Sequence, residues 1–321
     1  MKNELFDFRF LIRTIGIIIF IILLYNIDFI LFKDILYNID VKLLGLSIIM
    51  LFPLVGIKTL RWKYILKKYD IDYNYKDAYL AYFSSIYIGV LTPGRLGEFI
   101  RSFYVSNDCK LDKLKSFSSV LIDRLFDFYI LLIIGIFSIY NLSSIYFSYF
   151  IQILIIILFI SFGILIIRNK RSFNYLTINL FKKNTIINDL FNYKNWFSTL
   201  HAGLNIIDLN TLLKLSLLTV VSYMVFFYQS FILSISIGMT THPLNIIYAV
   251  TLGSLITLIP ISISGIGTRE LIITSYLSTK NIDTDISFVF SLLIFLNFYI
   301  VTALIGFLSW IIKPIPIEKN Y

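Results

Sequence analysis

Long apolar segments follow one another along almost the whole chain, separated by short polar ones. Crossing the hydrocarbon layer of a membrane takes about 20 consecutive apolar residues in a helix, and six segments reach that length without interruption. These six are 10–32, 41–60, 116–140, 147–167, 211–237 and 284–312. Two further apolar stretches, 78–105 and 244–278, are each broken by Pro and Gly. The pattern therefore predicts an all-α polytopic protein with six full spans and two broken, re-entrant helical hairpins.

The composition supports a membrane location. The 321 residues are 58% hydrophobic and 15% charged with a mean hydropathy of +0.84, whereas soluble domains are about half apolar and about a quarter charged. Thirty Phe and 22 Tyr residues exceed what one soluble core of this length can bury, so much of this surface must face lipid or neighbouring helices. A soluble enzyme is therefore excluded.

The sequence contains no pattern for a metal or a nucleotide. Cys109 is the single cysteine, which excludes an intramolecular disulfide framework, and His201 and His242 stand apart, without the spacing of zinc ligands. The glycines form neither a phosphate-binding loop nor a dinucleotide fingerprint. We therefore expect no cofactor and no intrinsic ATP hydrolysis.

The distribution of positive charge predicts the orientation in the membrane. If both broken stretches enter and leave on the same face, the polar segments divide into two groups. The first contains the two termini, 61–77, 106–115 and 168–210, and the second contains 33–40, 141–146, 238–243 and 279–283. Most of the 28 Lys and Arg residues belong to the first group, while only Lys33, Lys42 and Lys280 lie on or beside the second. By the positive-inside rule the first side is cytoplasmic.

The net charge of +9 follows from this topology and from attraction to anionic headgroups, so it requires no nucleic-acid partner. The basic, aromatic run from Arg61 to Lys68 invites an RNA-binding interpretation, but the end of a helix at the membrane interface is favoured. The first span is too long for the apolar region of a signal peptide and lacks a small-residue cleavage site, so we expect it to be retained.

We expect one transmembrane domain over 1–321, built from two repeats at about 41–168 and 211–312. Between them, residues 172–210 have apolar positions three and four apart among several lysines. This spacing predicts one or two amphipathic helices lying on the cytoplasmic interface.

The two broken stretches share a design: an apolar helix, a Pro/Gly interruption, and a short helix that opens with an Arg and a Glu. The first interruption runs from Thr92 to Glu98 and the second from Pro260 to Glu270. Three full spans lie between them, an odd number, so the second hairpin enters from the opposite face. We therefore predict an inverted repeat, an arrangement that in transporters places the substrate site near the midplane.

Each break is expected to form an anion site. Pro93 gives the preceding turn no N–H and Gly94 can adopt left-handed angles, so the chain turns there. Non-helical backbone at membrane depth must line a cavity, and the following helix begins with unpaired N–H groups at the positive end of its dipole. Arg95 and Arg269 stand at these two helix starts, where a guanidinium can bind a phosphate through two hydrogen bonds.

A third charged cluster lies in the span at 116–140. Asp123 and Asp127 share a helix face, where they repel each other unless a cation lies between or beside them, and Arg124 is their neighbour. Such residues are costly in lipid and either pair inside the bundle or mark a pathway. Two interpretations stay open: the charges only hold the bundle together, or they bind substrate or a coupling ion.

The pairing of these charges can be predicted in part. Arg95 and Glu98 are three residues apart and can pair locally, whereas Arg269 and Glu270 are adjacent and are expected to point apart. The buried charges counted this way balance, four cations against four anions. We predict pairs across the repeats: Glu270 with Arg95 or Arg124, and Arg269 with Glu98 or Asp127.

At these residues the sequence resembles a flippase-like transmembrane family typified by the membrane half of lysylphosphatidylglycerol synthase. The resemblance covers about 40–312, and the family pattern often has Glu at the position of Asp123. It implies a polytopic protein of a bacterial or archaeal cell membrane that moves lipids or lipid-linked molecules between leaflets. Because no synthase domain follows Tyr321, we expect no aminoacylation from this chain. The match rests on Thr92 to Glu98 with Arg101, on Asp123-Arg124 with Asp127, and on Ser264 to Gly267 with Arg269-Glu270.

We therefore expect a lipid flippase, a non-catalytic transporter of an anionic phospholipid or a polyprenyl-phosphate-linked lipid. Its phosphate would bind at the two half-helix N-termini. The expected substrate-binding residues are Thr92, Pro93, Gly94, Arg95, Glu98, Arg101, Ser264, Gly265, Gly267, Arg269 and Glu270. The expected charge network or coupling residues are Asp123, Arg124 and Asp127.

Two alternatives stay open. An integral membrane transferase using lipid-linked donors would need acidic residues on outer loops, and Asp34, Asp40, Asp283 and Asp285 form no catalytic grouping there. The other alternative is a non-transporting scaffold of envelope synthesis. Membrane lipids are the expected partners, a homo-oligomer or envelope-synthesis enzymes are possible further ones, and no nucleic acid is expected.

Overall fold

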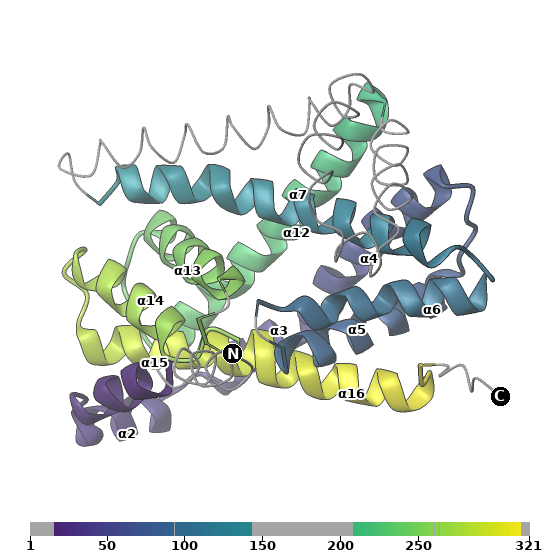
Figure 1. The fold of residues 1–321 in the computed structure, drawn as a ribbon. Coiled ribbons are helices and arrows are strands. Elements are labelled where there is room, and N and C mark those ends of the chain that lie inside the picture. Colours follow the sequence, from purple (N-terminus) through teal and green to yellow (C-terminus); the bar gives the residue numbers. More distant parts are fainter. Residues whose placement is uncertain (1–15, 93, 143–207, 260, 263, 316–321) are drawn as a thin grey trace, which may run out of the picture.

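The described part of the chain is helical, with no strand among its residues (Figure 1). The computed structural model describes residues 16–92, 94–142, 208–259, 261–262 and 264–315. The predicted span 147–167, most of the predicted amphipathic segment 172–210 and Pro93 lie outside these described residues. After a first helix at Gly16–Tyr25, the elements are α2 (Phe29–Tyr37), α3 (Val41–Ile49), α4 (Leu51–Lys68), α5 (Tyr75–Val90), η1 (Leu96–Ile100), α6 (Arg101–Asp108), α7 (Lys113–Tyr140), α12 (Leu209–Ser236), α13 (Pro243–Leu258), α14 (Thr268–Ser278), α15 (Thr284–Phe295), η3 (Leu296–Val301) and α16 (Thr302–Ile312).

Three helices of the described part are long and apolar enough to cross a membrane. They are Val41–Lys68, which joins α3 and α4, then α12, and Thr284–Ile312, which joins α15, η3 and α16. They correspond to the predicted spans 41–60, 211–237 and 284–312. Helix α7 is equally long, at 28 residues, but charged residues in its middle keep it out of this group. The chain is therefore a multi-pass membrane protein.

The first predicted span, 10–32, is bent in the described part of the chain. The helix described from Gly16 ends at Tyr25, and α2 leaves it at an angle of 91°. The carboxylate of Asp28 accepts hydrogen bonds from the backbone N–H groups of Ile30 and Leu31, which caps a new helix in the middle of the apolar run. The hydrophobic pattern predicted the extent of this segment, but it did not predict the bend, where Asp28 caps α2.

The two broken stretches form helix–break–helix hairpins, as the Pro and Gly positions predicted. In the first, α5 leads to η1 and α6, and in the second α13 leads to α14. The turn residues adopt left-handed angles, with φ of 60° at Gly94 and 75° at Gly265. At Gly97 a Cβ atom would lie 2.4 Å from the carbonyl oxygen of Ile88, so only glycine lets η1 run this close to α5.

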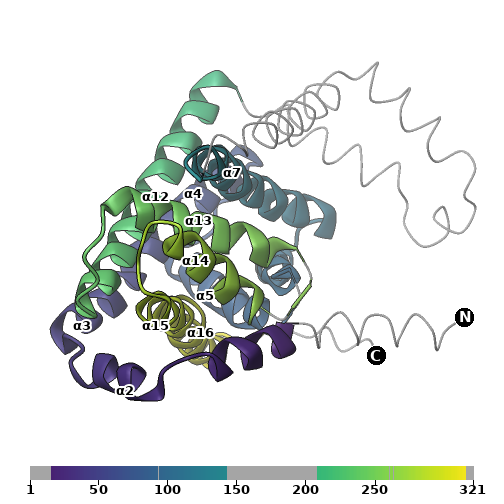
Figure 2. The same ribbon diagram turned by 90° about the vertical axis from the view of Figure 1, so that its left-hand side faces the viewer.

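Each hairpin packs against a long helix from the other half of the chain. Helix α16 lies along α5, and α13 lies against α7 as well as against α14 (Figures 1 and 2). Helices α4 and α12 pack against each other, and α4 also contacts α5 while α12 contacts α13. The hydrophobic core at these contacts includes Phe83, Ile246 and Phe290, all 1% exposed or less.

Polar contacts tie the helix ends together in two separate groups. At one end Lys313, which follows α16, is 2.8 Å from Asp77 and 2.6 Å from Asp108. At the other, the Lys280 ammonium donates to the carbonyl oxygen of Asn141 at 2.8 Å. These contacts join segments that the sequence assigned to the same side of the membrane.

Candidate functional site

The tips of the two hairpins meet. The hydroxyl of Ser264, in the second break, donates a hydrogen bond to the carbonyl oxygen of Val90 at the end of α5. The guanidinium carbons of Arg95 and Arg269 lie 5.3 Å and 4.4 Å from the centre of one aromatic ring, that of Tyr299. The structure thus brings the two arginines of the predicted anion sites together.

Tyr299 lies in η3, a π-helical turn between α15 and α16. Such a turn carries one extra residue and is common at functional sites. Here it presents Tyr299 to both arginines and leaves the amide of Asn297 buried against the hydroxyl of Ser47, at 2.5 Å. The sequence did not single out Tyr299, because one tyrosine among 22 gives no signal.

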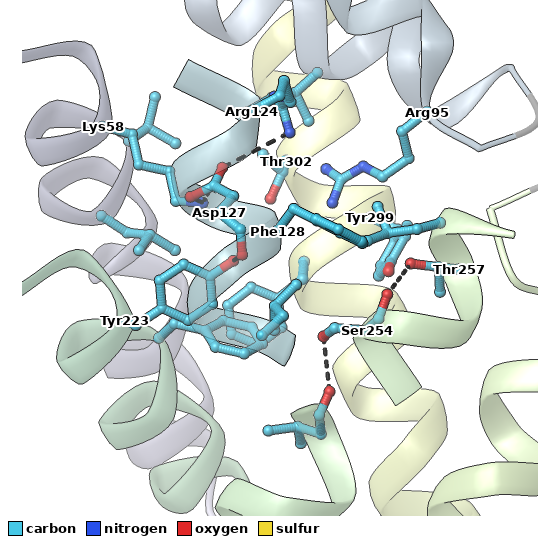
Figure 3. A pocket seen from close by; sticks show the side chains of 18 of the residues that line it. Lys58, Arg95, Arg124, Asp127, Phe128, Tyr223, Ser254, Thr257, Tyr299 and Thr302 are labelled. Atoms are coloured by element: carbon cyan, nitrogen blue, oxygen red, sulfur yellow. Dashed lines mark hydrogen bonds and ion pairs between the residues drawn. The ribbon is translucent and has the colours of Figure 1, made fainter. Parts of the chain in front are cut away.

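A cavity of about 300 Å³ lies beside these tips (Figure 3). Helices α4, α7, α12, α13 and α16 with η3 and the first break all contribute to it. Its charged lining consists of Lys58, Arg95, Arg124, Asp127 and Arg269, and its apolar lining includes Leu54, Val55, Phe128, Phe226, Val250 and Ile294. A hollow with cations at one part and hydrocarbon elsewhere suits an amphiphile.

Two aspartates of α7 are held by cations from other elements. The guanidinium of Arg61 is 2.7 Å from Asp123 and 2.9 Å from Asp127. Arg101 is 2.6 Å from Asp123, and Lys58 is 3.2 Å from Asp127. The predicted cation between the two aspartates is therefore present.

That cation is Arg61, which the sequence assigned to a helix end at the interface. The span predicted to end at 60 instead continues to Lys68, and Arg61 and Trp62 are 0% exposed. These two residues therefore lie buried inside the bundle, one to two turns before the end of the helix. The sequence could have pointed to Arg61 through its position one helical turn after Lys58. Two cations on one helix face can neutralise the two aspartates of α7.

The pairing around Glu98 follows the prediction in part. Glu98 is 1% exposed and pairs with Arg95, at 2.8 Å, as the local spacing predicted. Its second partner is Arg124 of α7. The carboxylate therefore holds the first hairpin tip against α7.

The predicted pairs across the repeats are wrong. Glu270 accepts from the guanidinium of its neighbour Arg269 and, at 2.6 Å, from the backbone N–H of Gly267. The side chain of Glu270 turns back to cap its own helix, and Arg269 folds over the rings of Phe295 and Tyr299. Two adjacent side chains therefore converge, although their Cα–Cβ bonds diverge.

Several predicted site residues support the tips and do not line the cavity. The hydroxyl of Thr92 accepts from the N–H of Gly97 at 2.7 Å, and the carbonyl of Ser264 accepts from Arg269 at 3.4 Å. A Cβ atom on Gly267 would lie 1.9 Å from the carbonyl oxygen of Gly16. Of the predicted residues, those that line the cavity are Gly94, Arg95, Arg124, Asp127 and Arg269, whereas Thr92, Glu98, Arg101, Asp123, Ser264, Gly265, Gly267 and Glu270 do not.

The charges do not balance as the sequence predicted. Lys58 and Arg61 join the four expected cations, so among the described residues six cations face four carboxylates, a net charge of +2. Buried charge of one sign is costly without a counter-charge. The cations are Lys58, Arg61, Arg95, Arg101, Arg124 and Arg269, and the carboxylates are Glu98, Asp123, Asp127 and Glu270.

Comparison with known proteins agrees with the resemblance carried by the three motifs. The profile of the family described as the lysylphosphatidylglycerol synthase TM region matches residues 10–306. The chain is also similar to a UPF0104 membrane protein of Methanocaldococcus jannaschii, with 24% identity over 289 residues and 82% of each chain covered. No solved structure matches it. Because the profile matches most of its length, the chain belongs to the family of the lysylphosphatidylglycerol synthase transmembrane region.

Proposed function

We propose that this protein is a lipid flippase that moves an anionic phospholipid or a polyprenyl-phosphate-linked lipid between leaflets of the cell membrane. The observation that carries the proposal is the shared cavity, where Arg95 and Arg269 from two separate hairpin tips face one hollow with an apolar wall. Guanidinium groups suit a phosphate, and the apolar wall suits the start of an acyl or polyprenyl chain. Membrane lipids are then the partners, and the protein acts as a transporter without catalysis.

The packing of the helices supports an inverted repeat. If α3–α4 corresponds to α12, the first hairpin to the second, and α7 to α15–α16, the contacts occur in matching pairs. Helix α5 packs against α16 as α13 packs against α7, and α6 packs against α7 as α14 packs against α15. If the bent N-terminal segment also crosses the membrane, then with α7 and the span at 147–167 this gives six full spans, two re-entrant hairpins and both termini in the cytoplasm, by the charge rule.

In such an arrangement, alternate opening of one half against the other would expose the cavity to each leaflet in turn. The tail stays in the bilayer while the head crosses past Arg95 and Arg269. Movement is downhill or is coupled to protons or ions through the carboxylates of Asp127 or Glu98. The buried network around Asp123 then fixes the position of α7 between the two tips.

Two of the four acids considered for a transferase have structural roles. The carboxylate of Asp40 accepts from the N–H groups of Lys42 and Leu43 and caps α3, and Asp283 caps α15. These roles favour transport over a transferase reaction.

The test is lipid translocation by the purified protein in sealed vesicles, measured with a lipid that carries a fluorophore on its acyl chain, which a membrane-impermeant reagent quenches in the outer leaflet. Arg95→Gln and Arg269→Gln are expected to insert and fold but to lose most translocation. The matched control is Lys33→Gln, which removes an exposed cation outside the cavity. Translocation at the wild-type rate by both arginine variants would overturn the proposal.

A further inference from the structure

One surplus positive charge lies around the two aspartates of α7. Arg61 and Arg101 are 0% exposed and both contact Asp123, while Asp127 is shared by Arg61 and Lys58. Three cations therefore share two carboxylates. Of the three, only Lys58 reaches the cavity.

The second surplus charge lies at the tip of the first hairpin. Glu98 contacts both Arg95 and Arg124, and Arg124 also lies 3.8 Å from Asp127. Among the described residues, five cations thus share the three carboxylates Glu98, Asp123 and Asp127. Arg269 and Glu270 form a balanced pair. Both surpluses are thus carried by groups that face the same hollow.

The side chains that carry these charges are open toward the cavity. Those of Lys58, Arg95 and Arg124 are 19%, 24% and 23% exposed, whereas those of Arg61 and Arg101 are 0% exposed. An anion in the hollow could therefore contact Lys58, Arg95 and Arg124, which line it, but not the two fully buried arginines.

We infer that the cavity takes a lipid head carrying two negative charges close together, as a terminal phosphomonoester or a diphosphate does, an inference that rests on the proposed function and narrows its substrate class. A phosphodiester with one negative charge would leave one of the two surplus charges buried and uncompensated. A zwitterionic head would bring a further cation into a cluster that already has too many.

The size of the hollow favours a compact head. About 300 Å³ is at the lower limit of ligand pockets, so a terminal phosphate or diphosphate fits with the first carbons of its chain, whereas a large headgroup does not. Oxygen atoms on a terminal phosphate point in three directions, which allows separate contacts with Arg95, Arg124 and Lys58. A diester loses one of these oxygens to its second substituent.

A pair of amphiphiles that differ by one methyl group tests this inference. The full chain, purified in an uncharged detergent, is titrated with dodecyl phosphate and with its methyl ester, and binding is measured by calorimetry. At pH 8 the phosphate is a dianion and the ester a monoanion, because the second pKa of a phosphomonoester is about 6. We expect the dianion to bind at least about tenfold more tightly.

At pH 5 both amphiphiles are monoanions, and the preference should fall close to one. Equal affinities at pH 8, or a preference that persists at pH 5, would overturn the inference. Arg124→Gln and Lys58→Gln should each reduce the preference at pH 8, whereas the control Lys33→Gln should leave it unchanged. The comparison of the two ligands on the wild-type chain needs no variant to fold.

Further experiments distinguish a lipid head from a free anion, and distinguish failure of this inference from failure of the proposed function. Inorganic phosphate or pyrophosphate that competes at the same concentration as dodecyl phosphate would assign the site to a free anion and overturn the lipid class. Translocation of diester and monoester lipids at equal rates would keep the flippase and reject the inference. A clear preference for the dianion without translocation of any lipid in vesicles would keep the inference and reject the flippase.

Discussion

Arg61 is the residue on which the buried charge network depends, because it is the only described cation in contact with both Asp123 and Asp127. Arg61→Ala removes the shared partner of two buried carboxylates, and we expect a loss of about 3–5 kcal/mol in stability. Arg61→Lys keeps the charge but cannot reach both acids with one planar fork, so it should recover only part of this. Thermal unfolding in detergent measures both, with the exposed Lys67→Ala as the control. A melting temperature of Arg61→Ala equal to that of the wild type would contradict the role of the network.

Gly267 and Gly45 form a second comparison at the residue scale. Gly267 has a φ of 80°, and a Cβ atom there would lie 1.9 Å from the carbonyl oxygen of Gly16. Gly267→Ala should therefore cost at least about 1–2 kcal/mol of stability and loosen the second tip. Gly45 is helical with nothing within 4 Å of its Cβ position, so Gly45→Ala should be neutral or stabilising by up to about 1 kcal/mol. Relative to the wild type, Gly267→Ala should lower the melting temperature, whereas Gly45→Ala should leave it unchanged or raise it. Equal melting temperatures of the two variants would contradict the close approach of Gly267 to Gly16.

At the scale of elements, the sequence was sufficient to predict structure where a residue determines the conformation of its own segment. Pro93 and Gly94 marked the first break, because backbone angles depend on the residue itself. The partners of Asp127 could not be read in the same way, since they depend on which helices lie side by side. The continuation of α4 through Arg61 was missed for a related reason: a charge ends an apolar run in the sequence but not a helix whose partner is buried with it. The bend at Asp28 likewise needed knowledge of which backbone groups that side chain would cap.

The end of α16 is held by an ion cluster outside the membrane span, and its stability should depend on pH. Burial alone would lower the pKa of Lys313, but hydrogen bonds to Asp108 and Asp77 and the charges of both acids outweigh it and raise this pKa above 10.5. The neighbouring Tyr73 is also shifted upward, chiefly by burial, so it does not lose its proton first. The stabilisation is therefore complete below pH 10.5 and is lost as the pH rises through the raised pKa of Lys313.

Lys313→Met should accordingly lower the melting temperature by a few degrees at pH 8, and the difference from the wild type should shrink at pH 11. The control is Lys76→Met, which removes an exposed cation beside Asp77. A difference that is the same at both pH values would mean that packing of the Lys313 stem, and not its charge, holds the end of α16.

At the scale of the whole molecule, the cavity exists because each half of the chain builds only part of it. Helices α4 and α7 supply Lys58, Arg124 and Asp127, while the second half supplies Tyr223, Arg269 and the π-helical turn (Figure 3). Neither half alone surrounds the hollow. Relative motion of the halves would therefore change its opening without breaking either hairpin, which is what transport between two leaflets requires.

The proposed transport also requires that the helix ends near Lys115 and Ser278 lie on opposite faces of the membrane, the first cytoplasmic by the charge rule. Both positions are exposed, and the single native Cys109 can be replaced by serine to give a background without thiols. In intact cells, a membrane-impermeant maleimide should label Ser278→Cys, whereas Lys115→Cys should react only after permeabilisation. The reverse pattern would invert the orientation. Labelling of both positions in intact cells would place them on one face, and the odd number of crossings between the two hairpins, on which the inverted repeat depends, would then be wrong.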